Sequence, residues 1–276
     1  MWKADDEITV VPDGGGRAPD VPPGRMLTKA GAFLAVAFVA AGALGAAQSA
    51  TPIPTEVVQL TQFGPALGVG VVALLWPARV RSTLAGAFGR VRLGVRGLLL
   101  LATAPLIIAL CVTAYGLITG DVRFTRPSAP HNPFALIVVA QLIGACGEEI
   151  GWRCFLQPLL RDRFGTLTSS VTVGVLWGVW HVQVFAQAPA YAGAFLLATV
   201  SLSVVMGLAL DRVRSSRLLL AGGFHALINL GLLLFMDEEA GAVLPMALFG
   251  AACLAAALLW AWRAPARIHG ISDRIR

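Results

Sequence analysis

The stretch Glu148-Glu149-Ile150-Gly151-Trp152-Arg153 places three ionisable side chains within six residues, inside a segment that otherwise has the hydrophobicity of a membrane span. An Asp, Lys or Arg at the centre of a transmembrane helix costs about 2.5–3.5 kcal/mol on insertion scales. A span keeps such groups only where they have a partner or a function. These residues therefore predict a membrane fold and, within it, a functional site.

The composition supports the membrane fold. The chain is 57% hydrophobic and 13% charged, with a mean hydropathy of +0.76, whereas a soluble domain is about 45–50% apolar and about 25% charged. We therefore expect an all-α polytopic membrane protein. The excess of arginine over lysine is typical of a GC-rich genome, so the expected location is a bacterial cytoplasmic membrane.

Eight apolar segments follow one another, and each is close to the 20 or so residues that a bilayer crossing needs. They cover 27–47, 57–76, 97–118, 133–158, 168–187, 192–210, 217–235 and 241–262. The expected organisation is a disordered tail over 1–25, a transmembrane domain over 26–263 and a short basic tail over 264–276. The first segment does not resemble a cleaved signal peptide, because the tail before it is long and acidic.

The basic residues give this layout an orientation. With the N-terminus in the cytoplasm, 18 of the 21 Lys and Arg residues fall in cytoplasmic segments. Only Arg123 and Arg126 fall in outer loops, and Arg153 lies within a span. This distribution predicts eight spans with both termini cytoplasmic. It also explains the net charge of +6 without nucleic acid as a partner. The stretch 79–96 is a candidate amphipathic helix on the anionic inner leaflet, with membrane lipid as its partner.

The polar residues of the fourth segment divide by helical geometry. Consecutive residues point about 100° apart, so Glu148 and Glu149 cannot face the same spot. Glu149 and Arg153 are four apart and can form a pair on one face. In the simpler interpretation this pair only braces the bundle. Glu148 then has no partner on its own helix.

Two further segments carry polar residues with the same spacing. Trp177 and His181 lie on the fifth segment, and His225 and Asn229 lie on the seventh. A single histidine on an apolar helix is more often a hydrogen-bonded core residue than a catalyst. Two histidines at depths compatible with that of Glu148 instead favour one shared cavity, in the middle to inner part of the bilayer.

This set of groups can hydrolyse an amide bond. A Glu and a His on one water act as a general base, while an imidazole and a carboxamide can donate hydrogen bonds to the tetrahedral oxyanion. No GxSxG motif supplies a serine nucleophile. The cysteines match no metal site and are expected to pack as small apolar residues; they are Cys111, Cys146, Cys154 and Cys253.

The order EExxxR, aromatic-xxx-His and HxxxN on successive spans resembles the CAAX protease and bacteriocin-processing (CPBP) family of intramembrane glutamate proteases, over about residues 135–235. The resemblance implies that Glu148 and His181 activate the water and that His225 and Asn229 bind the oxyanion. It also implies that Glu149 and Arg153 support the site and that no metal or other cofactor is required.

Two residues depart from the family pattern. Trp177 stands where a phenylalanine is usual, and we expect it only to enlarge the wall of the site. Cys154 stands where a glycine is usual, and it is expected to crowd the fourth span against a neighbour. Neither change removes a reacting group.

Three alternatives stay open. A member of this family could act as a bacteriocin immunity factor or regulatory membrane scaffold. Glu148, His181 and His225 could form the relay of a proton-coupled transporter. The same residues could bind zinc, although no HExxH is present. For the protease, the expected substrate is a peptide or a membrane-anchored protein.

Overall fold

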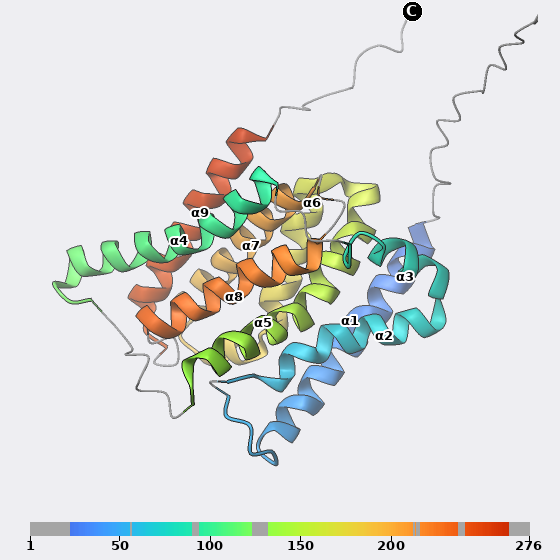
Figure 1. Cartoon of the computed structure of the whole chain (residues 1–276), viewed down its shortest axis with the longest axis horizontal. Helices are drawn as coiled ribbons and strands as arrows, with labels where there is room; N and C mark the ends of the chain where they lie inside the picture. The colour runs from blue at the N-terminus through green and yellow to red at the C-terminus, as the bar shows by residue number, and fades with distance from the viewer. Residues whose placement is uncertain are drawn as a thin grey trace, which may run out of the picture.

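The computed structural model describes residues 23–264 except 56, 90–93, 123–131, 212, 214–215 and 237–240. These residues form an all-α bundle, as predicted (Figure 1). Its elements are α1 (Pro23–Gln48), η1 (Leu60–Phe63), α2 (Gly64–Leu75), α3 (Pro77–Leu84), α4 (Val95–Thr119), α5 (Phe134–Gly151), η2 (Trp152–Leu156), α6 (Gln157–Trp180), η3 (Val182–Ala186), α7 (Pro189–Leu210), α8 (Arg217–Phe235) and α9 (Val243–Arg263). The predicted tails, and the outer-loop residues Arg123 and Arg126, lie almost entirely outside the described residues.

Six helices in the described part of the chain are long and apolar enough to cross a membrane, which indicates an integral membrane protein. They cover Gly24–Gln48, Val95–Thr119, Phe134–Trp180, Pro189–Leu210, Arg217–Phe235 and Val243–Arg263. The segment predicted over 57–76 is the shorter apolar helix Leu60–Leu75. The prediction of eight crossings with both termini cytoplasmic therefore stays a prediction.

The 47-residue stretch Phe134–Trp180 is not one straight helix. Gly165 has φ 75° and ψ 172°, a conformation that breaks the helical path and is essentially restricted to glycine. Residues 148 and 177 would lie about 44 Å apart along a straight helix. Their side chains instead form a hydrogen bond of 2.7 Å. The chain therefore folds back at Gly165, and its two segments meet in the interior of the bundle.

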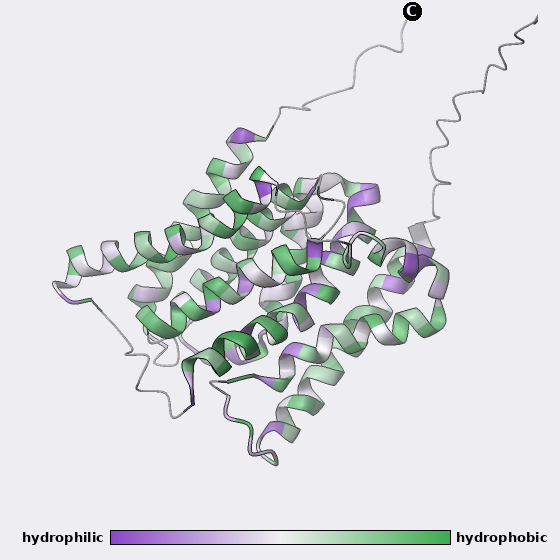
Figure 2. Cartoon of the chain, in the orientation of Figure 1, coloured by the Kyte–Doolittle hydropathy of each residue, from purple (hydrophilic) through white to green (hydrophobic). Residues whose placement is uncertain are grey.

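The centre of the bundle is α7, which packs between α6 and α9. In its most apolar window 67% of the residues are buried, compared with 22% for α1. Small polar groups connect α7 to α6: Ser203 Oγ donates to the carbonyl of Ser170 at 2.7 Å. On another side, α8 packs against α4 and α5, and α5 also contacts α2. Figure 2 shows that apolar residues dominate these helices.

One end of the bundle gathers ion pairs around the last turn of α7. Arg161 pairs with Asp211 at 3.3 Å, and the Arg96 guanidinium donates to the carbonyl of Leu208 at 3.0 Å. Nearby in the fold, Arg79 at the start of α3 pairs with Asp162 at 2.7 Å. We call this the basic end. The placement of the basic end in the cytoplasm stays a prediction. The expected amphipathic helix over 79–96 is shorter in the structure, because α3 ends at Leu84.

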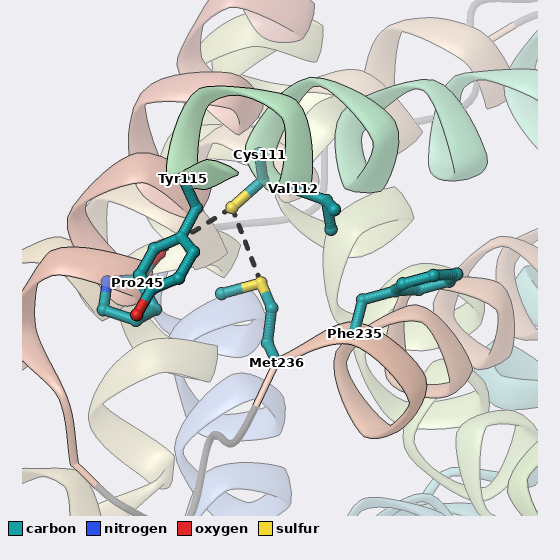
Figure 3. Close-up of a pocket in the computed structure, with 6 residues that line it drawn as sticks. All are labelled: Cys111, Val112, Tyr115, Phe235, Met236 and Pro245. Atoms are coloured by element: carbon teal, nitrogen blue, oxygen red, sulfur yellow. Dashed lines mark hydrogen bonds between the residues drawn. The ribbon is translucent and has the colours of Figure 1, made fainter. Parts of the chain in front are cut away.

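All four cysteines are free, and three of them are fully buried, in agreement with the packing role predicted for them. Figure 3 shows Cys111 of α4 directed toward Met236 and Pro245, with its sulfur 3.5 Å from Met236 Sδ. The hollow beside these residues has a volume of about 10 Å³. It has room for one water molecule at most, so it is not a ligand site.

Candidate functional site

The site is built around the end of α5, where the helix widens. The residues that follow Glu148 and Glu149 form a π-helical turn over Trp152–Leu156, a feature that is often found at functional sites. The backbone N–H of Trp152 is shared between the carbonyls of Glu148 and Glu149. The Trp152 ring is fully buried and packs edge-on against Phe33 and Trp180. This packing fixes the direction in which both carboxylates leave the helix.

Glu148 is 2% exposed, and its carboxylate is held from another helix. The indole N–H of Trp177, on α6, donates to Glu148 Oε2 at 2.7 Å. The expectation that Trp177 only enlarges the wall was therefore wrong. A phenylalanine has no N–H group, so it could not make this hydrogen bond. The other departure, Cys154, is fully buried in a small apolar cluster with Ala87 and Leu218.

His181 lies where α6 ends, and not within a continuing helix as the predicted segment over 168–187 implied. Its φ of −78° and ψ of 63° are not helical. Its Nδ1 lies 2.8 Å from the carbonyl oxygen of Trp177, one of the last-turn carbonyls that a helix leaves without a backbone partner. A carbonyl oxygen only accepts, so Nδ1 carries the proton. In the neutral ring Nε2 then keeps its lone pair. The rings of Trp177, Trp180 and Phe195 surround the imidazole edge-on.

Glu149 does more than pair with Arg153 along its own helix. Its Oε1 accepts from Arg153 at 3.2 Å, as the spacing of four predicted. The same oxygen lies 2.8 Å from Nδ1 of His225 on α8. The carboxylate and the guanidinium are both almost fully buried. Glu149 therefore links α5 to α8 and fixes the orientation of the His225 ring.

Arg153 also contacts the other half of the site. Its guanidinium carbon lies 4.3 Å from the centre of the Trp177 ring, a cation–π geometry. Trp177 in turn donates to Glu148, and its ring packs edge-on against His225 at 5.2 Å. One buried arginine thus supports both the Glu148 and the His225 side of the site.

Asn229 lies one turn after His225 on α8, as predicted from the sequence. Its Nδ2 donates to Oε1 of Gln141, on α5, at 3.2 Å. Because this bond uses one N–H of the carboxamide, the second N–H is left for a ligand.

The four residues predicted to react line one cavity of about 470 Å³. Glu148, His181, His225 and Asn229 border it, whereas Glu149 and Arg153 lie behind them. The apolar part of the wall comes from α7, α8 and α9, for example Phe195, Leu202, Leu232 and Phe249. The exposed part of the wall comes from the chain segments that connect α1 to α2 and α6 to α7. We call this part the mouth; it contains Thr55, Gln59, Gln183 and Gln187.

A metal centre is not apparent in these residues. Among the described residues, no three His, Cys, Asp or Glu side chains come together as a set that could hold a metal ion. The two histidine Nδ1 atoms are already committed, to a carbonyl and to a carboxylate.

The fold and this geometry define a polytopic helical membrane protein with a polar cavity inside the bundle. Residues 130–231 match the family model described as type II CAAX prenyl endopeptidase Rce1-like. That range includes Glu148, Glu149, Arg153, Trp177, His181, His225 and Asn229. Over these residues the chain is similar to type II CAAX prenyl endopeptidases, and this similarity agrees with the order of motifs in the sequence.

The chain is similar to lysostaphin resistance protein A of Staphylococcus aureus strain Newman and of strain COL, with 24% identity over 196 residues. The similarity covers 70% of this chain and 46% of each relative. The chain thus spans about half the length of the curated relatives it matches.

Proposed function

We propose that the protein is an intramembrane endopeptidase of a bacterial cytoplasmic membrane. In this proposal Glu148 and His181 activate a water molecule, and His225 and Asn229 stabilise the oxyanion. The observation that carries the proposal is that all four side chains border one cavity although they come from three separate segments. The family match over the same residues supports it.

The first step is attack by water on the carbonyl carbon of the scissile bond. Glu148 Oε2 is occupied by the Trp177 N–H, so Oε1 is the oxygen left to accept a proton from water. Nε2 of His181 accepts or orients the second hydrogen, since Nδ1 is already protonated. The base withdraws a proton as the C–O bond forms, a contribution of about 10²–10⁴ in rate.

The second step places negative charge on the carbonyl oxygen. Asn229 can offer its free N–H to this oxygen. His225 donates through Nδ1 to Glu149, so its Nε2 can also donate only when the ring carries both protons. The Glu149 carboxylate balances the resulting imidazolium. Two such donors each contribute about 2.7–4 kcal/mol to the transition state. The proton held by Glu148 then passes to the leaving amine as the C–N bond breaks.

The test is hydrolysis by the purified full-length protein in liposomes. A pool of membrane-anchored peptides is added, and mass spectrometry identifies new termini. We expect cleavage by the unchanged protein, and a loss of at least about 10² in rate for Glu148→Gln and for His181→Gln. Asp162→Asn, a carboxylate change at the basic end, is the matched control and should keep the rate.

Other outcomes would support the alternatives. Full activity in both active-site variants would overturn the assignment of residues. A protein that cuts nothing but moves protons into the liposomes would be a transporter. If the cellular phenotype of the gene persists in the Glu148→Gln strain, the protein acts as a scaffold or immunity factor, not through hydrolysis.

A further inference from the structure

Carboxamide side chains dominate the polar wall of the cavity. Besides Asn229, five glutamines border it: Gln59, Gln62, Gln141, Gln183 and Gln187. Among the residues that the structure describes, the lining contains no Lys or Arg, and Glu148 is its only Asp or Glu. We call Gln59, Gln62, Gln183 and Gln187 the amide wall. These four residues have no part in the chemistry described above.

Gln62 is the innermost residue of the amide wall. It is 6% exposed, and its Oε1 has no hydrogen-bond partner among the described residues. Its carboxamide packs against Gly144, where a Cβ would collide with it. Gly144 lies one helical turn before Glu148 on the same face of α5. A buried polar group without a partner costs free energy. Although this oxygen is enclosed against Gly144, the Gln62 side chain also borders the cavity, next to the path of a ligand that approaches Glu148.

The chemistry of the wall selects one class of ligand. A carboxamide both donates and accepts hydrogen bonds and carries no charge. A polypeptide main chain has the same pattern, and each of its N–H and C=O groups needs a partner once it leaves water. A lipid tail would leave the glutamines unpaired. An anion would lack a cationic partner, because no Lys or Arg lies among the described residues of the lining.

The positions along the wall fit an extended segment. Gln59, Gln183 and Gln187 are exposed at the mouth, whereas Gln62 is buried next to the α5 face that carries Glu148. A ligand that enters at the mouth therefore meets carboxamides before it reaches the reacting groups. Much of the remaining wall is apolar, for example Phe195, Leu202 and Phe249, so ligand side chains that contact it do not need charge.

We propose that the amide wall is a subsite that binds the main-chain N–H and C=O groups of an extended polypeptide beside the catalytic residues. The proposal rests on the proposed function in taking Glu148 as the reacting group, but binding does not require hydrolysis. Recognition is then directed to the peptide main chain, largely independent of the side-chain sequence.

Binding to the full-length Glu148→Gln protein in detergent micelles tests this subsite without hydrolysis. The probe is a fluorescent eight-residue Leu/Ala peptide with blocked ends. The comparison ligand is the same peptide with ester oxygens in place of alternate main-chain N–H groups. We expect the all-amide peptide to bind about tenfold more tightly, as expected when donors to buried acceptors are lost. Equal affinities, or no binding of either ligand, would overturn the proposal.

Two variants connect that difference to the wall. Gln62→Leu in the Glu148→Gln background should reduce the preference for the amide peptide to about twofold or less. Gln157→Leu is the matched control, since Gln157 is also 6% exposed with an unpaired Oε1 but does not line the cavity. It should keep the tenfold preference. Gln59→Leu, at an exposed position, gives a second reading in case Gln62→Leu does not fold, and it should also reduce the preference.

The result separates this inference from the proposed function. If the amide peptide binds with the expected preference but the unchanged protein cuts no peptide, the subsite stands and the endopeptidase assignment fails. If the unchanged protein cuts peptides while the wall variants keep the full amide preference, the endopeptidase stands and the subsite is wrong.

Discussion

The indole nitrogen of Trp177 lies 2.7 Å from Oε2 of Glu148, across 29 residues of chain and from a different helical segment. This contact decides which carboxylate oxygen faces the cavity. It also ties the geometry of the site to the reversal at Gly165. Trp177 is therefore a positioning residue in the proposed mechanism.

Replacing Trp177 by phenylalanine tests this role. Hydrogen bonds to charged groups contribute about 1.5–3 kcal/mol, so Trp177→Phe should lower the stability of the protein in detergent by an amount in this range. The family resemblance includes a phenylalanine here, so kcat should stay within about tenfold. The comparison variant is Trp180→Phe, because the indole of Trp180 donates to a neutral acceptor, the carbonyl of Ala37. If both variants had unchanged stability, the hydrogen bond to Glu148 would contribute nothing.

Neutralising Glu149 should be far more damaging to the fold. Glu149→Gln leaves Arg153 and the His225 ring without their buried counter-charge, and breaking such a pair costs about 3–5 kcal/mol. The measurement is thermal unfolding in detergent. The double variant Glu149→Gln/Arg153→Met removes both charges and should recover part of the loss.

A surface pair provides the comparison for Glu149. Asp162→Asn breaks the ion pair with Arg79, in which the Asp162 side chain is 58% exposed. Exposed pairs contribute about 1 kcal/mol or less, so this variant should unfold close to the unchanged protein. Similar losses for Glu149→Gln and Asp162→Asn would contradict the buried network.

Asn229→Ala should separate catalysis from binding. In the proposed mechanism the Asn229 N–H acts on the oxyanion, which exists only after attack. We therefore expect kcat to fall by about 10²–10³ with little change in KM. Gln141→Ala removes only the partner that orients the carboxamide and should have a smaller effect on kcat. A raised KM with unchanged kcat would instead assign Asn229 to substrate binding.

The reversal at Gly165 is open to a direct test. Its backbone conformation is costly for a residue with a Cβ, so Gly165→Ala should lose about 1–3 kcal/mol of stability. Gly193→Ala in α7 is the matched control, because its Cβ would meet nothing within 4 Å and its φ is not positive. It should change stability by about 1 kcal/mol or less, in the stabilising direction. Equal effects would show that the chain reversal does not depend on this glycine.

The sequence predicted the local part of this site well and the tertiary part poorly. The Glu149–Arg153 pair is confirmed because helical spacing alone brings the two side chains together. Glu149 and His225 are 76 residues apart, so no periodicity could indicate their contact. The end of α6 at His181 was missed because the chain continues with apolar residues, Val182, Val184 and Phe185.

Other features gave no usable signal. The indole N–H of Trp177 was visible in the sequence, but its acceptor depends on how the chain folds back at Gly165. Glutamines near loops are ordinary, so nothing marked Gln59, Gln62, Gln183 and Gln187 as neighbours of one cavity. The span predicted over 57–76 is the shorter helix Leu60–Leu75 in the structure, because its apolar pattern is longer than the helix that forms.

The position of α7 has a consequence for access to the cavity. Gln187 at the mouth precedes the first residue of this helix, and Asp211 at the basic end follows its last. The 22 residues of α7 span about 33 Å, close to the thickness of a bilayer core. In a membrane, the mouth and the basic end would therefore face different compartments. In sealed vesicles, a peptide would reach the amide wall only from the side that the mouth faces. The fold would therefore determine from which side of the membrane the peptide must be supplied.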